Sequence, residues 1–379
     1  MSRALALYFL SAFGSMTSFY LLLSVVPLYA TAAGAGGVGA GLTTGALMLA
    51  TVAAELATPA LLARFGYRLV LAAGLLLLGA PALALIACSS LAAILAISLV
   101  RGVGLAITVV AGSSLVATLV PAERRSEGLG LLGVVVGVPA VLALPLGVWL
   151  VEQVGFAPVF VAGAIAALVC LVVMPALPGR VAGAGESIGV LAGLRTRAQL
   201  RPALVFLLTA MGTGIVVTFL PLATRASGRL AAGALFANTV ATTLARWSAG
   251  RYGARHGQAG LLVGGVVAAA LGMLALAFTP SPASVAAGAV LLGLGFGVAQ
   301  NASLTLMFDR VSASGYDMVS AVWNLAYDAG MGLGAAGFGV LAVRAGYAGA
   351  FGIVAGLMLV ALAPVWRDRG WLVPADDVV

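Results

Sequence analysis

The chain has 379 residues, of which 63% are hydrophobic and only 8% charged, and its formal net charge is +8. A soluble globular protein could not cover its surface with so few polar side chains, so the composition predicts an integral membrane protein. All nineteen basic residues are arginine. Without lysine, an ATPase with a Gly-x-x-x-x-Gly-Lys phosphate-binding loop is excluded.

Twelve apolar runs follow one another along the chain. A run of about 20 residues suffices to cross the hydrocarbon layer of a bilayer. Such runs must be helical, because lipid offers the backbone polar groups no other hydrogen-bond partner. The predicted spans are residues 4–30, 39–63, 69–88, 92–119, 128–151, 156–177, 203–224, 231–249, 260–279, 283–308, 318–343 and 347–366.

The distribution of arginine predicts the topology. If the N-terminus is cytoplasmic, fifteen arginines fall on the inner side and three, Arg225, Arg229 and Arg344, on the outer side, while Arg101 lies inside a span. The positive-inside rule therefore predicts that both termini are cytoplasmic. Topology thus explains the excess of positive charge, and no nucleic-acid partner is expected.

The two halves of the sequence repeat one another. Residues 63–66 (ARFG) end the second run and residues 254–257 (ARHG) end the eighth, so that position 255 minus position 64 gives an offset of 191. The same offset relates residues 101–104 (RGVG) to residues 292–295 (LGLG). We therefore predict an N-terminal six-helix bundle over residues 1–177, a cytoplasmic linker over 178–202 and a C-terminal six-helix bundle over 203–379.

Two parallel six-helix halves joined by a basic loop resemble the major facilitator superfamily. The loop after the second span, residues 59–68 (PALLARFGYR), resembles the family's loop signature but lacks its aspartate, and residues 250–257 (GRYGARHG) lack it again. The resemblance implies two pseudo-symmetric bundles with twelve transmembrane helices. It also implies cytoplasmic gating loops that contain Arg64, Gly66, Arg68, Gly250, Arg251, Arg255 and Gly257.

Two features resemble the drug/proton antiporter branch of that family. Arg101 corresponds to a buried arginine in the family's fourth helix, and Gly133, Gly137 and Pro139 loosely follow the glycine pattern of its fifth helix. The resemblance implies proton-coupled export of small amphipathic organic compounds by alternating access. A sugar or metabolite carrier, including a facilitator, is the alternative.

Glu55, Arg101 and Asp328 place ionisable groups inside predicted spans. A charge at bilayer depth costs about 2.5 kcal/mol or more, so it persists only beside a cavity or a partner. A carboxyl group in such a site holds a proton readily, which suits proton coupling or gating. The alternative is a fixed ion pair or hydrogen-bond network that locks helices together. In the family, helices 2 and 11 are neighbours, which would place Glu55 and Asp328 on adjoining helices.

Polar side chains in other spans are candidates for substrate binding. Carriers of this architecture bind substrate near the midplane, and the candidates lie in spans 1, 10 and 11. Hydrogen bonding between helices is the alternative role of such groups. The candidates are Tyr20, Gln300, Asn301, Asn324 and Tyr327.

The remaining expectations follow from residues the chain has in small number. With one histidine, two distant cysteines and no HExxH motif, neither an enzyme nor a metal site is expected. A channel or a membrane receptor is a further alternative. We expect no cofactor beyond a proton gradient, and as partners the bilayer and a small organic substrate of a monomeric protein. The Ala-, Gly- and Arg-rich composition favours the inner membrane of a bacterium.

Overall fold

The computed structural model describes residues 3–120, 125–179, 197–224, 228–256, 258–311, 316–360 and 362, and over these ranges it contains helices and no strands. The predicted all-α fold is therefore confirmed. In chain order the helices are α1 (Arg3–Leu23), α2 (Val25–Ala30), η1 (Thr31–Ala35), α3 (Gly36–Ala84), α4 (Leu91–Leu119), α5 (Arg125–Val154), α6 (Phe156–Leu168), η3 (Val169–Ala176), α8 (Arg197–Ala223), α9 (Gly228–His256), α10 (Gln258–Leu276), α11 (Pro282–Phe308) and α12 (Tyr316–Val360).

The number of long helical segments fits the twelve predicted spans. Within the described ranges, eight stretches are long and apolar enough to cross a membrane. The first, Arg3–Ala84, contains two backbone breaks, and the last, Met318–Leu359, contains one, so these two stretches comprise five segments. Together with the other six stretches and with α9, which contains four arginines, they make twelve.

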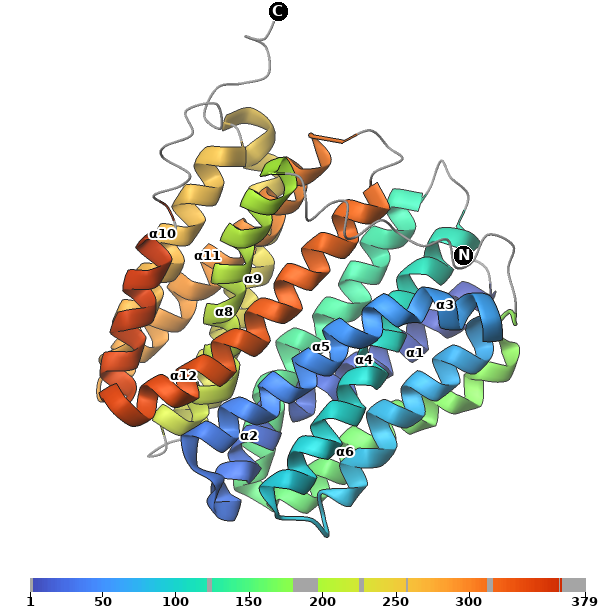
Figure 1. The fold of residues 1–379 in the computed structure, drawn as a ribbon, viewed down its shortest axis with the longest axis horizontal. Coiled ribbons are helices and arrows are strands. Elements are labelled where there is room, and N and C mark those ends of the chain that lie inside the picture. The colour runs from blue at the N-terminus through green and yellow to red at the C-terminus, as the bar shows by residue number, and fades with distance from the viewer. Residues whose placement is uncertain are drawn as a thin grey trace, which may run out of the picture. The chain divides into compact units, whose positions relative to one another are not determined.

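Long helices turn back on themselves at glycines with positive φ. Gly66 (φ 76°) divides α3, and Gly346 (φ 67°) divides α12, each into a first and a second arm. Figure 1 shows the chain reversing its direction between the two arms of α12. Gly155 (φ 79°) separates α5 from α6. A left-handed conformation costs residues with a Cβ atom energy, which explains glycine at these turns.

The chain divides into two compact units, residues 1–187 and 188–379. The division lies inside the predicted linker, and the beginning of α8 at Arg197 shows that residues 197–202, predicted as linker, are helical. In unit 1, α4 packs against α3, and in unit 2, α11 packs against α9 and α10.

Close glycine contacts repeat between the units at the predicted offset. A Cβ atom at Gly102 of α4 would collide with the carbonyl oxygen of Leu47, and one at Gly293 of α11 with that of Asn238, and in both pairs the numbers differ by 191. Gly104 and Gly295 show the same relation with the carbonyl oxygens of Gly74 and Gly265. The repeat in the sequence is therefore a repeat of helix packing inside each unit.

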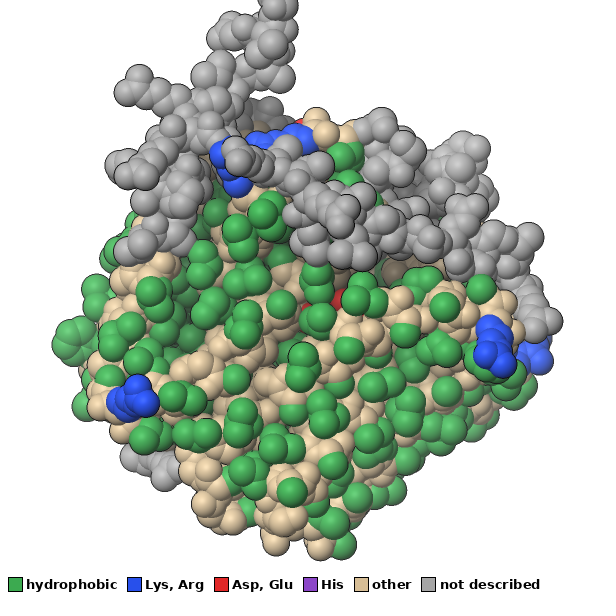
Figure 2. Space-filling model, viewed as in Figure 1, with side chains coloured by type: hydrophobic (Ala, Val, Ile, Leu, Met, Phe, Trp, Pro, Cys, Tyr) green, Lys and Arg blue, Asp and Glu red, His purple; other side chains and the backbone are tan. Residues whose placement is uncertain are grey.

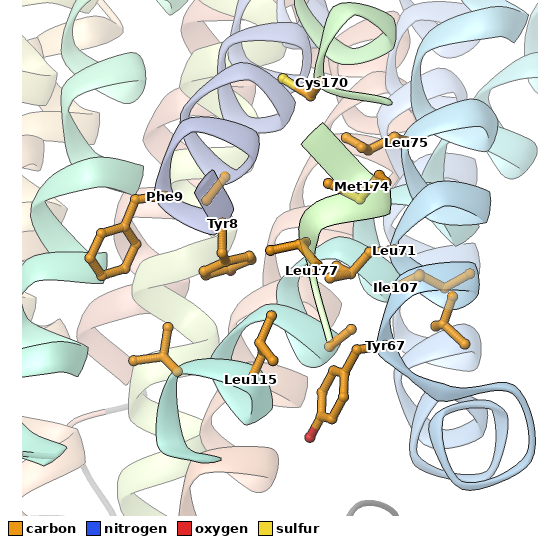
Figure 3. Close-up of a cluster of buried hydrophobic side chains, with 14 of the residues drawn as sticks. Tyr8, Phe9, Tyr67, Leu71, Leu75, Ile107, Leu115, Cys170, Met174 and Leu177 are labelled. Atoms are coloured by element: carbon orange, nitrogen blue, oxygen red, sulfur yellow. The ribbon is translucent and has the colours of Figure 1, made fainter. Parts of the chain in front are cut away.

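The core of unit 1 forms where α1, α3, α4 and η3 meet. Figure 3 shows Leu177, at the end of η3, between Tyr8 of α1 and Leu71 of α3, with Met174 of η3 above them and Leu115 of α4 below. These side chains are almost fully buried. Removal of their apolar surface from water or lipid headgroups holds the ends of these helices together.

The outer surface is apolar. Val172, Val343 and Leu49 are 79%, 69% and 66% exposed, and Figure 2 shows hydrophobic side chains over most of the viewed face. Exposed large apolar side chains are unfavourable in water but suit contact with lipid. The surface is consistent with an integral membrane protein.

Candidate functional site

Arg101 is buried inside unit 1, in the middle of α4. Its side chain is 1% exposed. The Nε donates to the carbonyl oxygen of Leu78 in α3 at 3.2 Å, and Nη2 donates to that of Ser18 in α1 at 3.4 Å. Among the described residues these carbonyl groups are its hydrogen-bond partners. Arg101 therefore ties α4 to α1 and α3, which is the locking arrangement that the sequence left open as an alternative.

A small cavity adjoins the Arg101 side chain. It is lined by Arg101 and Ser98 of α4, by Thr43 and Thr44 of α3, and by apolar residues of α1, α2 and α3. The buried hydroxyl of Ser18, whose carbonyl accepts from Arg101, has no hydrogen-bond partner in the described part of unit 1. The cavity has room for about one water molecule, which is too little for an organic substrate.

Glu55 lies on the first arm of α3, away from Arg101. Gly102, next to Arg101 in α4, packs against the backbone of Leu47 in this arm. Glu55 follows Leu47 by eight residues in the same arm. At 1.5 Å per residue the separation along the axis is about 12 Å. Glu55 is partly exposed. The structure therefore does not join these two predicted residues in one ion pair.

Asp328 lies in the first arm of α12 and is buried, with 7% of its surface exposed. Asn324, one helical turn earlier, shares its face and is partly exposed. The predicted proximity of Glu55 and Asp328 concerns different units and stays a prediction.

Tyr327 belongs to a cluster of four aromatic rings that the sequence analysis did not predict. Phe206 of α8 stacks on Trp323 of α12, with ring centroids 4.5 Å apart and planes 11° apart. Phe296 of α11 lies 5.9 Å from Phe206 at 8°, and Tyr327 lies 6.1 Å from Phe206 at 14°. The indole Nε1 of Trp323 donates to the Oγ of Ser303 at 3.0 Å.

One sequence signal indicates this cluster in retrospect. Trp323 and Tyr327 are four residues apart, and therefore share a helix face directly beside the face of Asn324 and Asp328. Close packing of α12 on α8 completes the cluster, because Gly330 admits the carbonyl group of Leu207. Pairing of α8 with α12 is a tertiary feature that spacing within one helix does not reveal.

The other predicted substrate residues are spread over both units. Asn301 faces α9, since a Cβ atom at Gly250 would lie 3.4 Å from the Nδ2 of Asn301. The Oδ1 of Asn301 is buried without a hydrogen-bond partner among the described residues. Such contacts are those of helix packing. Gln300 is partly exposed on α11. In unit 1, Tyr20 is partly exposed, with its ring 4.8 Å from that of Phe19.

The predicted gating loop of unit 1 is bound to the end of η3. Arg68 donates from Nε and Nη2 to the carbonyl oxygen of Leu177 at 3.1 and 2.8 Å. The backbone N–H of Tyr67 donates to the carbonyl oxygen of Gly179 at 2.7 Å. Gly66 provides the turn itself, while Arg64 is exposed and has its Cζ 5.2 Å from the Phe65 ring.

The matching region of unit 2 is built differently. Arg251 places its Cζ 3.9 Å from the ring of Trp247, one turn away on α9, next to Gly250. The backbone of Arg255 belongs to α9, but its side chain and the whole of Gly257 lie outside the described residues.

Charged residues cluster at the C-terminal end of α11 in unit 2. Burial, and then the neighbouring Arg201, lower the pKa of Arg310 below its usual value, while Asp309 opposes the shift. Nearby, the Nε2 of Gln199 donates to the carbonyl oxygen of Met307 at 3.1 Å and so joins α8 to α11.

Sequence comparison identifies the family. The profile of the Major Facilitator Superfamily matches residues 8–315 and again residues 202–376. The chain belongs to the major facilitator superfamily. It is therefore a membrane transporter of this superfamily, as the two repeated halves and the loop motif led us to expect. Among curated proteins no relative matches the chain.

Solved structures of other transporters share the major facilitator fold. The nucleoside transporter NupG is 14% identical with a TM-score of 0.77, covering 97% of this chain and 99% of that one. A POT family transporter in complex with 5-aminolevulinic acid is 12% identical with a TM-score of 0.79, covering 99% and 97%. The human organic anion transporter MFSD10 (TETRAN) is 17% identical with a TM-score of 0.65, covering 95% and 98%. At these identities the likeness concerns the fold alone.

Proposed function

We propose that this transporter exports small amphipathic organic compounds in exchange for protons, by alternating access. The observation that carries the proposal is Asp328, a carboxyl group buried in a membrane-spanning helix. A charge at this depth is costly, so the group gains by binding a proton whenever its surroundings are dry. Uptake on one side of the membrane and release on the other would couple proton flow to the carrier cycle.

The other two intramembrane charges have supporting roles in this proposal. Glu55 is a second proton carrier, because it lies in a span and is partly exposed. Arg101 is a fixed positive charge that holds α1, α3 and α4 in one arrangement through the carbonyl groups of Ser18 and Leu78. Its contacts support a positioning role in gating.

The cellular setting belongs to the same proposal. The excess of arginine on one side of the spans supports cytoplasmic termini, and the composition supports a bacterial inner membrane. We further propose that the carrier works as a monomer with no cofactor, driven by the proton gradient.

A second candidate function is the transport of a sugar or another polar metabolite. The partly exposed amides of Gln300 and Asn324 favour it, because they can donate and accept hydrogen bonds with a neutral polar solute. The compounds named for two structural neighbours, nucleosides for the transporter NupG and 5-aminolevulinic acid in the complex of the POT family transporter, are polar as well.

Reconstitution in proteoliposomes tests the proposal. Purified protein with a trapped pH indicator would be exposed to a panel of lipophilic cations, sugars and nucleosides. Export by proton exchange predicts that a lipophilic compound releases protons in a saturable way and accumulates against its gradient when a pH gradient is imposed. Saturable counterflow of a sugar without proton movement would support the second candidate and contradict the first.

A further inference from the structure

The four-ring cluster of unit 2 differs in geometry from the other aromatic clusters of the chain. The ring planes of Phe206, Phe296, Trp323 and Tyr327 lie within 22° of one another in every measured pair. The other clusters mix near-parallel and steep pairs: 25° between Phe156 and Phe160 but 83° between Tyr29 and Phe160 in unit 1, and 28° between Phe338 and Tyr347 but 50° between Phe338 and Phe351 in unit 2. Tilted and edge-to-face contacts fill a core well. Parallel planes, in contrast, offer faces on which a further flat ring can stack.

The internal repeat shows that the shared scaffold does not require three of these four rings. Residues 323–328 of α12 read WNLAYD, and the matching residues 132–137 of α5 read LGVVVG. Phe296 corresponds to Leu105 at the same offset of 191. At the positions of Trp323, Tyr327 and Phe296, unit 1 therefore has the aliphatic side chains of Leu132, Val136 and Leu105. The aromatic and polar groups of unit 2 are an addition to a scaffold that folds without them.

Exposure divides the cluster into a base and an accessible part. Phe206 and Phe296 are 0% and 4% exposed, whereas Trp323 and Tyr327 remain partly exposed. The hydrogen bond from Trp323 to Ser303 fixes the indole plane. A rigid indole on a buried phenyl base is preorganised, so a ligand ring that stacks on it loses little free energy to ordering of the protein.

Hydrogen-bonding groups lie on the face beside the accessible rings, where Asn324 is partly exposed and Asp328 is 7% exposed. Asn324 and Asp328 occupy the neighbouring face of the same arm of α12, one turn apart. The amide and the carboxyl oxygens accept hydrogen bonds, and a carboxylate also attracts a positive charge. The aromatic faces themselves attract cations. A flat ring that carries a nitrogen donor suits both helix faces: the ring can stack on Trp323 and Tyr327, and the donor can bind to Asn324 and Asp328.

We infer that residues 323–328 form a stacking site for planar aromatic amines, with Trp323 and Tyr327 holding the ring and Asn324 and Asp328 receiving the amine. This inference rests on the proposed transport function for its physiological meaning, and it names the substrate class of that function.

Binding of two matched cations tests the inference. Ethidium is a flat aromatic amine with one positive charge, and tetrapropylammonium has the same charge without a ring or an N–H group. Isothermal titration calorimetry on the full chain in nanodiscs should show at least tenfold tighter binding of ethidium. The substitution Trp323→Leu, which introduces the residue of position 132, should weaken ethidium binding about tenfold, whereas Trp323→Phe should weaken it less than threefold.

Two further variants separate a binding role from a packing role. Tyr327→Val, which introduces the residue of position 136, should also weaken ethidium binding several-fold and weaken tetrapropylammonium binding less, because only ethidium has a flat ring that stacks on the phenol. Trp149→Leu removes a 41% exposed tryptophan of α5 and should leave both probes unchanged. Wild-type affinity for ethidium in a stably folded Trp323→Leu protein, or equal weakening of both probes, would overturn the inference. If Trp323→Leu does not fold, Tyr327→Val decides by the same criterion.

Transport in proteoliposomes keeps this inference distinct from the proposed function. Preferential ethidium binding without any proton-driven movement of solute would leave the stacking site in place and contradict proton-coupled export. Proton-driven transport of tetrapropylammonium by a protein with no preference for ethidium would leave the proposed function in place and overturn the stacking site.

Discussion

The two units share one scaffold and differ in the side chains placed on it. In both, paired glycines of one helix admit the carbonyl groups of two neighbours at positions 191 residues apart. On that scaffold, α4 of unit 1 carries Arg101 where α11 of unit 2 carries Leu292, and the first arm of α12 carries Asp328 where α5 carries Gly137. The backbone contacts have been kept, while the ionisable groups have diverged.

The comparison separates residues that the fold requires from residues that it tolerates. A position with the same contact in both units serves packing, because both copies need it. A position that is charged or aromatic in one unit and neither in the other is not required by the shared scaffold. Asp328 and the rings of Trp323 and Tyr327 fall in the second class, as we expect of groups that bind a substrate or a coupling ion.

The largest expected effect is loss of the fold when the shared glycine contacts are filled. Gly102→Leu and Gly293→Leu each drive a side chain into a backbone carbonyl group that helix packing fixes. We expect each to destabilise its unit by several kcal/mol, since overpacking costs about 1–3 kcal/mol even where side chains can adjust. Folded yield and the thermal unfolding midpoint of the purified protein measure the effect.

A glycine with open surroundings provides the control for that pair. A Cβ atom at Gly264 of α10 would meet nothing within 4 Å, so Gly264→Leu should leave yield and midpoint near those of the wild type. If only one of Gly102→Leu and Gly293→Leu were harmful, the two units would not share the scaffold described above.

An exchange at position 101 and its counterpart should have unequal effects. Leu292 is 0% exposed in unit 2, so Leu292→Arg buries a charge without prepared partners and should cost about 3–5 kcal/mol. Arg101→Leu removes two hydrogen bonds, but the matching position of unit 2 already accommodates leucine. The substitution should therefore cost about 1–2 kcal/mol. Chemical unfolding followed by intrinsic fluorescence compares them. Equal losses would mean that unit 1 is not built to receive a cation.

A smaller effect is expected at the loop of unit 1. Arg68→Ala removes two charge-assisted hydrogen bonds to Leu177, and the matching position of unit 2 is Ala259. Because the site is partly solvated, we expect a loss of about 1–2 kcal/mol, read as a lower thermal midpoint. Arg251→Ala, which removes a contact with the exposed ring of Trp247, should cost less than about 1 kcal/mol. A larger loss at Arg251 than at Arg68 would contradict this order.

The fold could be predicted from the sequence largely because lipid leaves the backbone few choices. The helix boundaries follow the apolar runs closely: the tenth run, predicted over 283–308, is α11 (Pro282–Phe308). The beginning of α8 at Arg197 differed from the prediction, because a helix can continue beyond the hydrocarbon into water, where arginine is tolerated.

The candidate site was only partly predictable. Asp328 and Tyr327 stood out because polar groups are rare in apolar spans. Trp323 and Phe206 did not, since aromatic residues are ordinary in spans, and only the packing of α8 on α12 brings them together. The carbonyl partners of Arg101 were likewise hidden, because every residue has a carbonyl group and sequence does not show which one a guanidinium reaches.

The most direct test of the account is the substitution Asp328→Asn in proteoliposomes, with Asp309→Asn at the end of α11 as the matched control. The substitution keeps the size of the side chain and removes its ability to bind and release a proton. We predict that pH-driven transport falls to the level of protein-free liposomes while counterflow of the same solute persists, and that Asp309→Asn transports like the wild type. Unchanged pH-driven transport by the Asp328→Asn protein would contradict the account.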